Sequence, residues 1–364
     1  VAVLVMCLLP NAGSFGMAVS TAMIFGLVSL MFLDTSINMA MQPFKMMVGD
    51  MVNEKQKGLA YSIQSFLCNA GSLVGFLFPF IFTWIGISNI APQGVVPDSV
   101  IYSFYIGAAI LILCVIYTTV KVKEMPPAEY AEYHGITEEE KKEKINMVKL
   151  LVKAPKAFWT VGLVQFFCWF AFMFMWTYTN GSVAANVFDA PTVETVVNGA
   201  NKVVLDTKSI QYQNAADWVG VLFAVQAIGS VIWAVILPLF KVRKIAYSIS
   251  LVLGGIGFIS TLFFTDQYLL FISYLLIGCA WAAMLAMPFT ILTNSISGKN
   301  MGAYLGLFNG TICIPQIVAA VVGGGLLHLV GGHQVNMLVL AGILLIAGAI
   351  CVFFIKETIA HHEE

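Results

Sequence analysis

The chain has 364 residues, of which 59% are hydrophobic and only 10% are charged, and its mean hydropathy is +0.88. This balance excludes a soluble globular domain, and the net charge of −1 gives no sign of a nucleic-acid partner. Several windows of about 20 residues carry almost no charge, which is the length a helix needs to cross the bilayer core. The sequence therefore predicts an all-α, polytopic helical membrane protein.

We expect ten membrane spans, the first of them cut short. They lie near residues 1–9, 15–49, 58–86, 101–121, 157–180, 216–240, 245–265, 268–296, 301–328 and 335–355. Alternate loops on one side hold fifteen of the 18 Lys and Arg residues, those on the other side hold two, and Lys45 lies within a span. Because cytoplasmic loops collect cations, we expect the 123–156 connection and the C-terminus to be cytoplasmic.

The span near 15–49 carries polar residues where an apolar helix continues. Asp34, Asn38, Gln42 and Lys45 fall on one helical face, within about 80° of one another. A charge near the bilayer centre costs on the order of 2.5 to 3.5 kcal/mol, and such residues usually line pathways. One interpretation is that Asp34 titrates in ion coupling while Lys45 supplies a counter-charge. The other is that both are paired to fix helix packing, with Lys45 reaching toward the cytoplasmic interface.

Gln64 is the polar candidate in the next span, beside a ridge of small residues formed by Cys68, Gly71 and Gly75. The ridge indicates a close helix contact, with Gln64 in the pore. All seven cysteines fall in apolar spans without ligand spacing, and we interpret them as buried thiols that form no disulfide and hold no metal.

The long cytoplasmic connection divides the chain into residues 1–122, 123–156 and 157–364. Within it, Thr137 to Glu140 has the pattern of a capping box ahead of an amphipathic helix that Pro155 stops. We expect this segment to tether two halves. The polar loop at 181–216 carries no assigned function.

In the span near 157–180, Gln165, Trp169, Phe172 and Trp176 share a mixed polar and aromatic face. Sugars present C–H faces that stack on aromatic rings, and their hydroxyls need polar partners. The alternative is an aromatic stripe that packs against neighbouring helices. In the span near 301–328, Asn309 and Gln316 also share a face, where they either line a cavity or form hydrogen bonds between helices.

The two halves of the chain resemble each other around two Pro-Phe pairs. Pro43 and Pro288 are 245 residues apart, and at this offset Asp34 corresponds to Cys279. Repeats of like orientation across a central loop are typical of secondary transporters. Six spans follow the loop and fewer than four precede it, so this symmetry predicts that about two and a half helices are missing from the front.

Asp34, Asn38, Pro43, Lys45 and Asp50 match the D-x-x-x-N-x-x-x-x-P-x-R-x-x-x-x-D pattern of helix four in sucrose-type proton symporters. These form part of the glycoside-pentoside-hexuronide branch of the major facilitator superfamily. Further similar stretches are "APQGVVPDSVIYSFYIGA", "QFFCWFAFMFMW" and "YLGLFNGTICIPQIV". The chain departs from the family in having Lys45 in place of Arg, and "TYTNGSVAA" in place of the D-x-x-G-R-E cluster of the plant relatives.

The resemblance to bacterial members implies a secondary active transporter in the inner membrane, not an enzyme, built as two six-helix halves. It would import a glycoside, such as a sucrose- or maltose-type disaccharide, with protons, as a monomer in the lipid bilayer and without cofactor or metal. Asp34 and Lys45 would couple protons, and Asp50 would form a cytoplasmic gate. The expected sugar contacts are Asn38, Gln42, Gln64, Gln165, Trp169, Trp176, Asn309 and Gln316. Two alternatives are a sodium-coupled sugar carrier and a membrane sensor built on a transporter scaffold.

Overall fold

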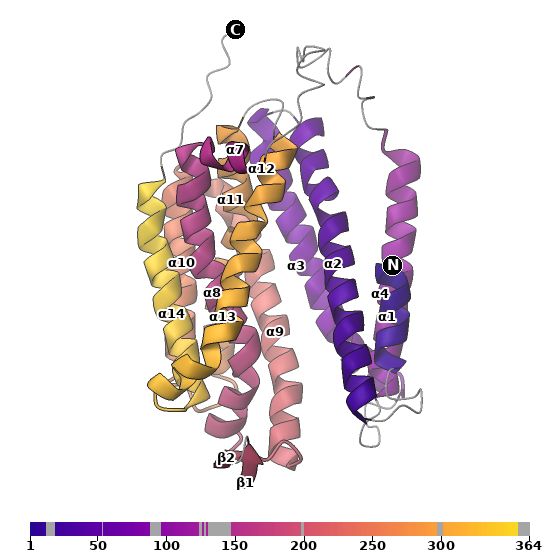
Figure 1. The fold of residues 1–364 in the computed structure, drawn as a ribbon, viewed down its shortest axis with the longest axis vertical. Helices are drawn as coiled ribbons and strands as arrows, with labels where there is room; N and C mark the ends of the chain where they lie inside the picture. Colours follow the sequence, from indigo (N-terminus) through magenta and orange to yellow (C-terminus); the bar gives the residue numbers. More distant parts are fainter. Residues whose placement is uncertain are drawn as a thin grey trace. The chain divides into compact units, whose positions relative to one another are not determined.

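The computed structural model describes residues 1–11, 19–52, 54–87, 96–123, 126, 129, 147–197, 200–296 and 301–355. Long helices dominate the described chain (Figure 1), because a helix satisfies its own backbone polar groups within an apolar segment. The helices are α1 (Ala2–Leu8), α2 (Val19–Met51), α3 (Glu54–Trp84), α4 (Asp98–Lys121), α7 (Met147–Val152), α8 (Lys156–Asn186), α9 (Ile210–Ile236), α10 (Arg243–Ser260), α11 (Leu270–Ser295), α12 (Met301–Phe308), α13 (Gly310–Leu329) and α14 (Gln334–Cys351).

Seven stretches of the described helices are long and apolar enough to cross a membrane. They are Ile24–Met41, Asp98–Lys121, Lys156–Asn186, Ile210–Leu239, Leu270–Thr293, Gly302–Leu329 and Gln334–Phe354. Each coincides with an expected span. The other expected spans are occupied by α1, α3 and α10, which are not among the seven. The expected class, a polytopic all-α membrane protein, is confirmed.

The loop between α8 and α9 contains a two-stranded antiparallel hairpin that we did not expect. Strands β1 (Thr192–Val197) and β2 (Ala200–Leu205) pair in a register that places Thr192 opposite Leu205. After the hairpin, Ser209 caps α9, since its Oγ accepts a hydrogen bond of 3.2 Å from the Tyr212 backbone N–H. Figure 1 shows the hairpin at the end of α8 that lies opposite α7.

The chain falls into two compact units. Unit 1 comprises Val1–Met51 and Val74–Glu143, and unit 2 comprises Val52–Leu73 and Lys144–Glu364. Helix α3 runs from one unit into the other, and its first part, up to Leu73, belongs to unit 2. The expected division of the chain at residues 122 and 156 stays a prediction.

Within unit 2, α8 packs against α9, α11, α13 and α14. Its span and that of α11 are the two most enclosed, with 61% and 67% of their residues buried. Helices α9 and α11 cross closely at two glycines: a Cβ on Gly229 would lie 2.5 Å from the Leu275 carbonyl oxygen, and one on Gly278 would meet the Gln226 carbonyl. Small residues at a crossing let helix backbones approach each other in a membrane.

A short helix, α7, lies before Pro155, where an amphipathic helix was expected; its amphipathic character stays a prediction. The Thr137–Glu140 capping box lies outside the described residues. None of the seven cysteines forms a disulfide. The expectation that all are buried is wrong, because only Cys168 and Cys279 are buried. Cys7 and Cys351 are half-buried, and three are exposed, namely Cys68, Cys114 and Cys313.

Candidate functional site

The polar centre of unit 2 is Gln165, which lies in the middle of α8 and is completely buried. Its Nε2 donates a hydrogen bond of 3.4 Å to the carbonyl oxygen of Met284 on α11. In a regular helix that carbonyl would accept the N–H of the residue four positions later, but this residue is Pro288, which has none. Gln165 Oε1 is buried without a partner among the described residues. The proline therefore orients the amide and leaves its oxygen available.

Tryptophans extend this polar centre along α8. Trp169 and Trp176 lie one and three turns beyond Gln165, and their ring centroids are 6.4 Å apart. Each is 5.8 Å from the ring of Trp281 on α11. Trp169 is half-buried, and its Nε1 has no partner among the described residues. Trp176 is 43% exposed, so the described protein leaves part of its ring uncovered.

Phe172 has a different role from the tryptophans. It is completely buried between Phe258 of α10, at 5.8 Å, and Trp281, at 4.9 Å. The packing interpretation therefore holds for Phe172. Its ring packs against the Trp281 indole and so restricts the movement of that indole.

Trp281 was missed by the sequence analysis. It sits among small residues in the middle of an apolar helix, between Ala280 and Ala282. Tryptophans in membrane proteins gather at the two interfaces, so one at mid-span was an available signal. The contact of Trp281 with the aromatic residues of α8 becomes visible only in the structure, where α11 packs against α8.

Helix α3 contributes a polar residue, Asn69, that the sequence analysis also missed. Asn69 is 1% exposed; its Nδ2 donates 2.7 Å to the Ser65 carbonyl, and its Oδ1 is buried without a partner among the described residues. Ser65 Oγ in turn donates a 3.5 Å bond to the Ala282 carbonyl on α11. Gln64, the candidate from this helix, is half-buried. Asn69 therefore lies one turn from the contact with α11.

Asn309 lies at the short break between α12 and α13, within the single span Gly302–Leu329 that was expected near 301–328. Its Nδ2 lies 3.9 Å from Cys313 Sγ, and its Oδ1 is buried without a partner among the described residues. Gln316, seven residues later, is half-buried. The structure gives no contact that joins these two amides to each other, so their shared role stays a prediction.

The polar stripe of unit 1 lies on α2, which has only 11% of its span buried. Asn38 Nδ2 donates 2.9 Å to the backbone carbonyl of Asp34. The Asp34 carboxylate is exposed, and no ion pair or side-chain hydrogen bond joins it to another described residue. The side chains of three candidates on this helix lie outside the described part of the structure. They are Gln42, Lys45 and Asp50.

Unit 2 therefore contains buried polar atoms that the described protein does not satisfy. Among them are the amide oxygens of Asn69, Gln165 and Asn309 and the Trp169 indole N–H. A buried polar atom without a partner costs about 1 to 3 kcal/mol. Hydroxyl groups of a ligand can donate to the oxygens and accept from the indole, while its C–H faces stack on tryptophan. Helix α11 carries no charged residue, which suits a neutral ligand.

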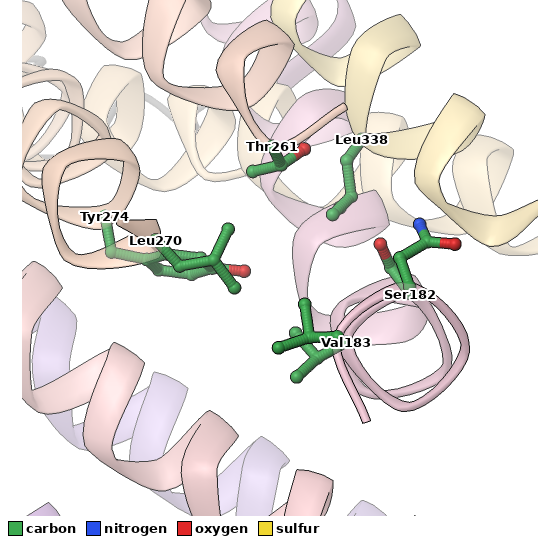
Figure 2. Close-up of a pocket in the computed structure, with 8 residues that line it drawn as sticks. Ser182, Val183, Thr261, Leu270, Tyr274 and Leu338 are labelled. Carbon is green, nitrogen blue, oxygen red and sulfur yellow. The ribbon is translucent and has the colours of Figure 1, made fainter. Parts of the chain in front are cut away.

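A separate small cavity lies on another side of α8. Figure 2 shows it between Ser182 and Val183 of α8 and Tyr274 of α11, with Thr261 and Leu338 above. Its volume is about 10 Å³, enough for one water molecule. This cavity is too small for a sugar and is not the candidate site.

Comparison with known proteins identifies the fold. The family model described as Major Facilitator Superfamily matches residues 1–200 and again residues 190–364. No curated protein matches the chain.

Three solved structures of transporters are similar to this chain. A variant of the E. coli fucose:proton symporter FucP is 13% identical, with a TM-score of 0.64 over 98% of this chain and 83% of that one. FucP in its outward conformation is 13% identical, with a TM-score of 0.66 over 98% and 81%. A bacterial homolog of the human lysosomal transporter Spinster, inward-facing and occupied, is 13% identical, with a TM-score of 0.51 over 97% and 81%. At this identity the likeness establishes the fold alone.

Proposed function

Because the chain belongs to the Major Facilitator Superfamily, and is thus a membrane transporter and not an enzyme, we propose that it imports a glycoside together with protons. The sugar would be a disaccharide of the sucrose or maltose type. The proposal places the chain in the glycoside-pentoside-hexuronide branch, on the helix-four pattern that runs from Asp34 to Asp50.

The observation that carries the sugar assignment is the set of unpartnered polar atoms beside three tryptophans. Gln165 and Trp169, which carry these atoms, share one face of α8, and the Trp169 ring lies 5.8 Å from the ring of Trp281. A neutral ligand with many hydroxyls and apolar C–H faces satisfies both kinds of group. FucP, whose fold this chain shares, is a fucose:proton symporter, and we extend a sugar substrate to this chain by that analogy.

The proton assignment depends on Asp34. Its carboxylate lies within the apolar span Ile24–Met41 and has no partner among the described residues. An ionisable group in such a span usually marks an ion or proton pathway. Asp34 would bind a proton on the outer side and release it to the cytoplasm, with Lys45 as the counter-charge and Asp50 at the cytoplasmic gate.

The other proposed sugar contacts are polar and aromatic side chains on several helices. Asn38 and Gln42 would contribute from α2, Gln64 from α3, Trp176 from α8, and Asn309 and Gln316 from α12–α13. The protein would act as a monomer in a bacterial inner membrane, with the 123–156 connection and the C-terminus in the cytoplasm.

Uptake by purified protein in proteoliposomes tests this proposal. Radiolabelled mono- and disaccharides are offered under an imposed pH gradient, and again under a sodium gradient without a pH gradient. Accumulation of a disaccharide driven by the pH gradient supports the proposal. Accumulation that requires sodium replaces it with a sodium-coupled carrier. Saturable sugar binding without any uptake would indicate a sensor.

A further inference from the structure

The polar and aromatic face of α8 continues one turn beyond Trp176. Asn180 follows Trp176 by four residues and Gln165 by fifteen, so all three lie on the same side of the helix. The Asn180 Oδ1 atom is buried and has no partner among the described residues. The site described above does not use this oxygen.

The residues next to Asn180 explain where its side chain points. The Thr179 and Tyr274 hydroxyls, on α8 and α11, are hydrogen-bonded at 3.0 Å. On other sides of α8, a Cβ on Gly323 of α13 would lie 2.7 Å from the Tyr178 hydroxyl oxygen. Three helices of unit 2 thus fix the rotation of α8, since Gly181 also faces the side chain of Gln334 on α14. This rotation directs Asn180 to the face that carries Trp169 and Trp176.

Gln165 and Asn180 occupy two separate positions along this face of α8. Fifteen residues span about 22 Å of helix, too far for one disaccharide to contact both the Gln165 and the Asn180 amides. Trp176 and Asn180 are only about 6 Å apart along the axis. Trp176 is also 43% exposed, whereas Gln165 is completely buried. The Trp176 ring is thus more exposed than the Gln165 amide, while Asn180 Oδ1 is buried.

We propose that Trp176 and Asn180 form a second, outer subsite for a sugar, at the hairpin end of α8. A C–H face of the sugar stacks on the Trp176 indole, and one hydroxyl donates to Asn180 Oδ1. This inference rests on the proposed sugar transport. Because the hairpin end lies opposite the cytoplasmic linker in the proposed orientation, the outer subsite holds the arriving sugar before it reaches Gln165.

The test compares Asn180→Ala, Asn180→Ser and Gln165→Ala in proteoliposomes and in detergent. For Asn180→Ala we expect a KM for uptake raised about fivefold, the effect of losing one hydrogen bond. The equilibrium dissociation constant at the inner site should change less than about twofold, while Gln165→Ala weakens it about tenfold. Asn180→Ser keeps a hydroxyl acceptor and should recover part of the lost uptake. Thr177→Ala is the matched control, because the Thr177 hydroxyl already donates 2.8 Å to the Met173 carbonyl of its own helix.

Thermal unfolding separates a subsite from a structural role. Removing an unsatisfied buried oxygen should leave the Tm of the sugar-free protein unchanged or raised. A lowered Tm for Asn180→Ala would contradict the proposal, as would unaltered uptake or an equal loss of equilibrium affinity in the Asn180 and Gln165 variants. If the unaltered protein transports no sugar, the proposed function fails. If it transports sugar and Asn180→Ala behaves like Thr177→Ala, only the outer subsite fails.

Discussion

Gln165 of α8 supplies the hydrogen bond that Pro288 of α11 cannot make. The Met284 carbonyl would accept the N–H of residue 288 in an uninterrupted helix, and it accepts Gln165 Nε2 at 3.4 Å instead. In an apolar environment a freed backbone carbonyl needs such a partner. The same bond holds the amide in one orientation, with Oε1 left for a ligand.

The first prediction concerns this link. Pro288→Ala restores the backbone donor for Met284, so the Gln165 amide loses its fixed partner and turns more freely. We expect the Tm to rise, because a helix-interior proline is removed, and sugar affinity to fall about fivefold. Thermal unfolding and isothermal titration measure the two effects.

A double-mutant cycle provides the control for this prediction. The loss of stability caused by Gln165→Leu should be larger in the unaltered protein than in the Pro288→Ala background, because only the former needs the amide donor. Equal losses in the two backgrounds would show that the proline and the glutamine act independently.

A second prediction concerns Trp281. Its ring lies within 6 Å of Phe172, Trp169 and Trp176, at the centre of the aromatic cluster. Trp281→Leu should weaken sugar binding about tenfold, because an aromatic platform is lost. The sugar-dependent change in tryptophan fluorescence should fall with it. Trp218→Leu removes an indole that stacks on Phe271 outside the cluster, and it should leave the affinity unchanged.

A third prediction tests the close crossing of α9 and α11. Gly229→Ala places a methyl group about 2.5 Å from the Leu275 carbonyl oxygen, so the helices must separate. We expect a loss of about 1 to 3 kcal/mol in stability and a lower Tm. Gly220→Ala on the same helix meets nothing within 4 Å and should leave the Tm unchanged or raised. Similar Tm values for the two variants would contradict the close crossing.

The helices could be predicted from the sequence because uninterrupted apolar runs leave few other structures open in a bilayer. The span expected at 335–355 is helical at 334–351, and that expected at 101–121 at 98–121. The aromatic side of α8 was also visible, because the spacing of Gln165, Trp169 and Trp176 defines one face.

Trp281 and Asn69 could not be predicted in the same way. Each is a single residue in an apolar helix, so periodicity does not tell which neighbour it meets; only the packing of α11 against α8 and α3 does. The hairpin did have a signal, since Val- and Thr-rich runs flank Asn198-Gly199, a common hairpin turn. The sequence analysis considered only the polarity of this loop, so the two short strands were not predicted.

Proton coupling through Asp34 is the central claim, and transport by Asp34→Asn tests it most directly. The substitution removes the titratable group and keeps its size, so the account predicts that accumulation driven by a pH gradient is lost while sugar counterflow continues. Asp98→Asn, at the exposed start of α4, should keep both activities. Gradient-driven accumulation by Asp34→Asn equal to that of the unaltered protein would contradict the account.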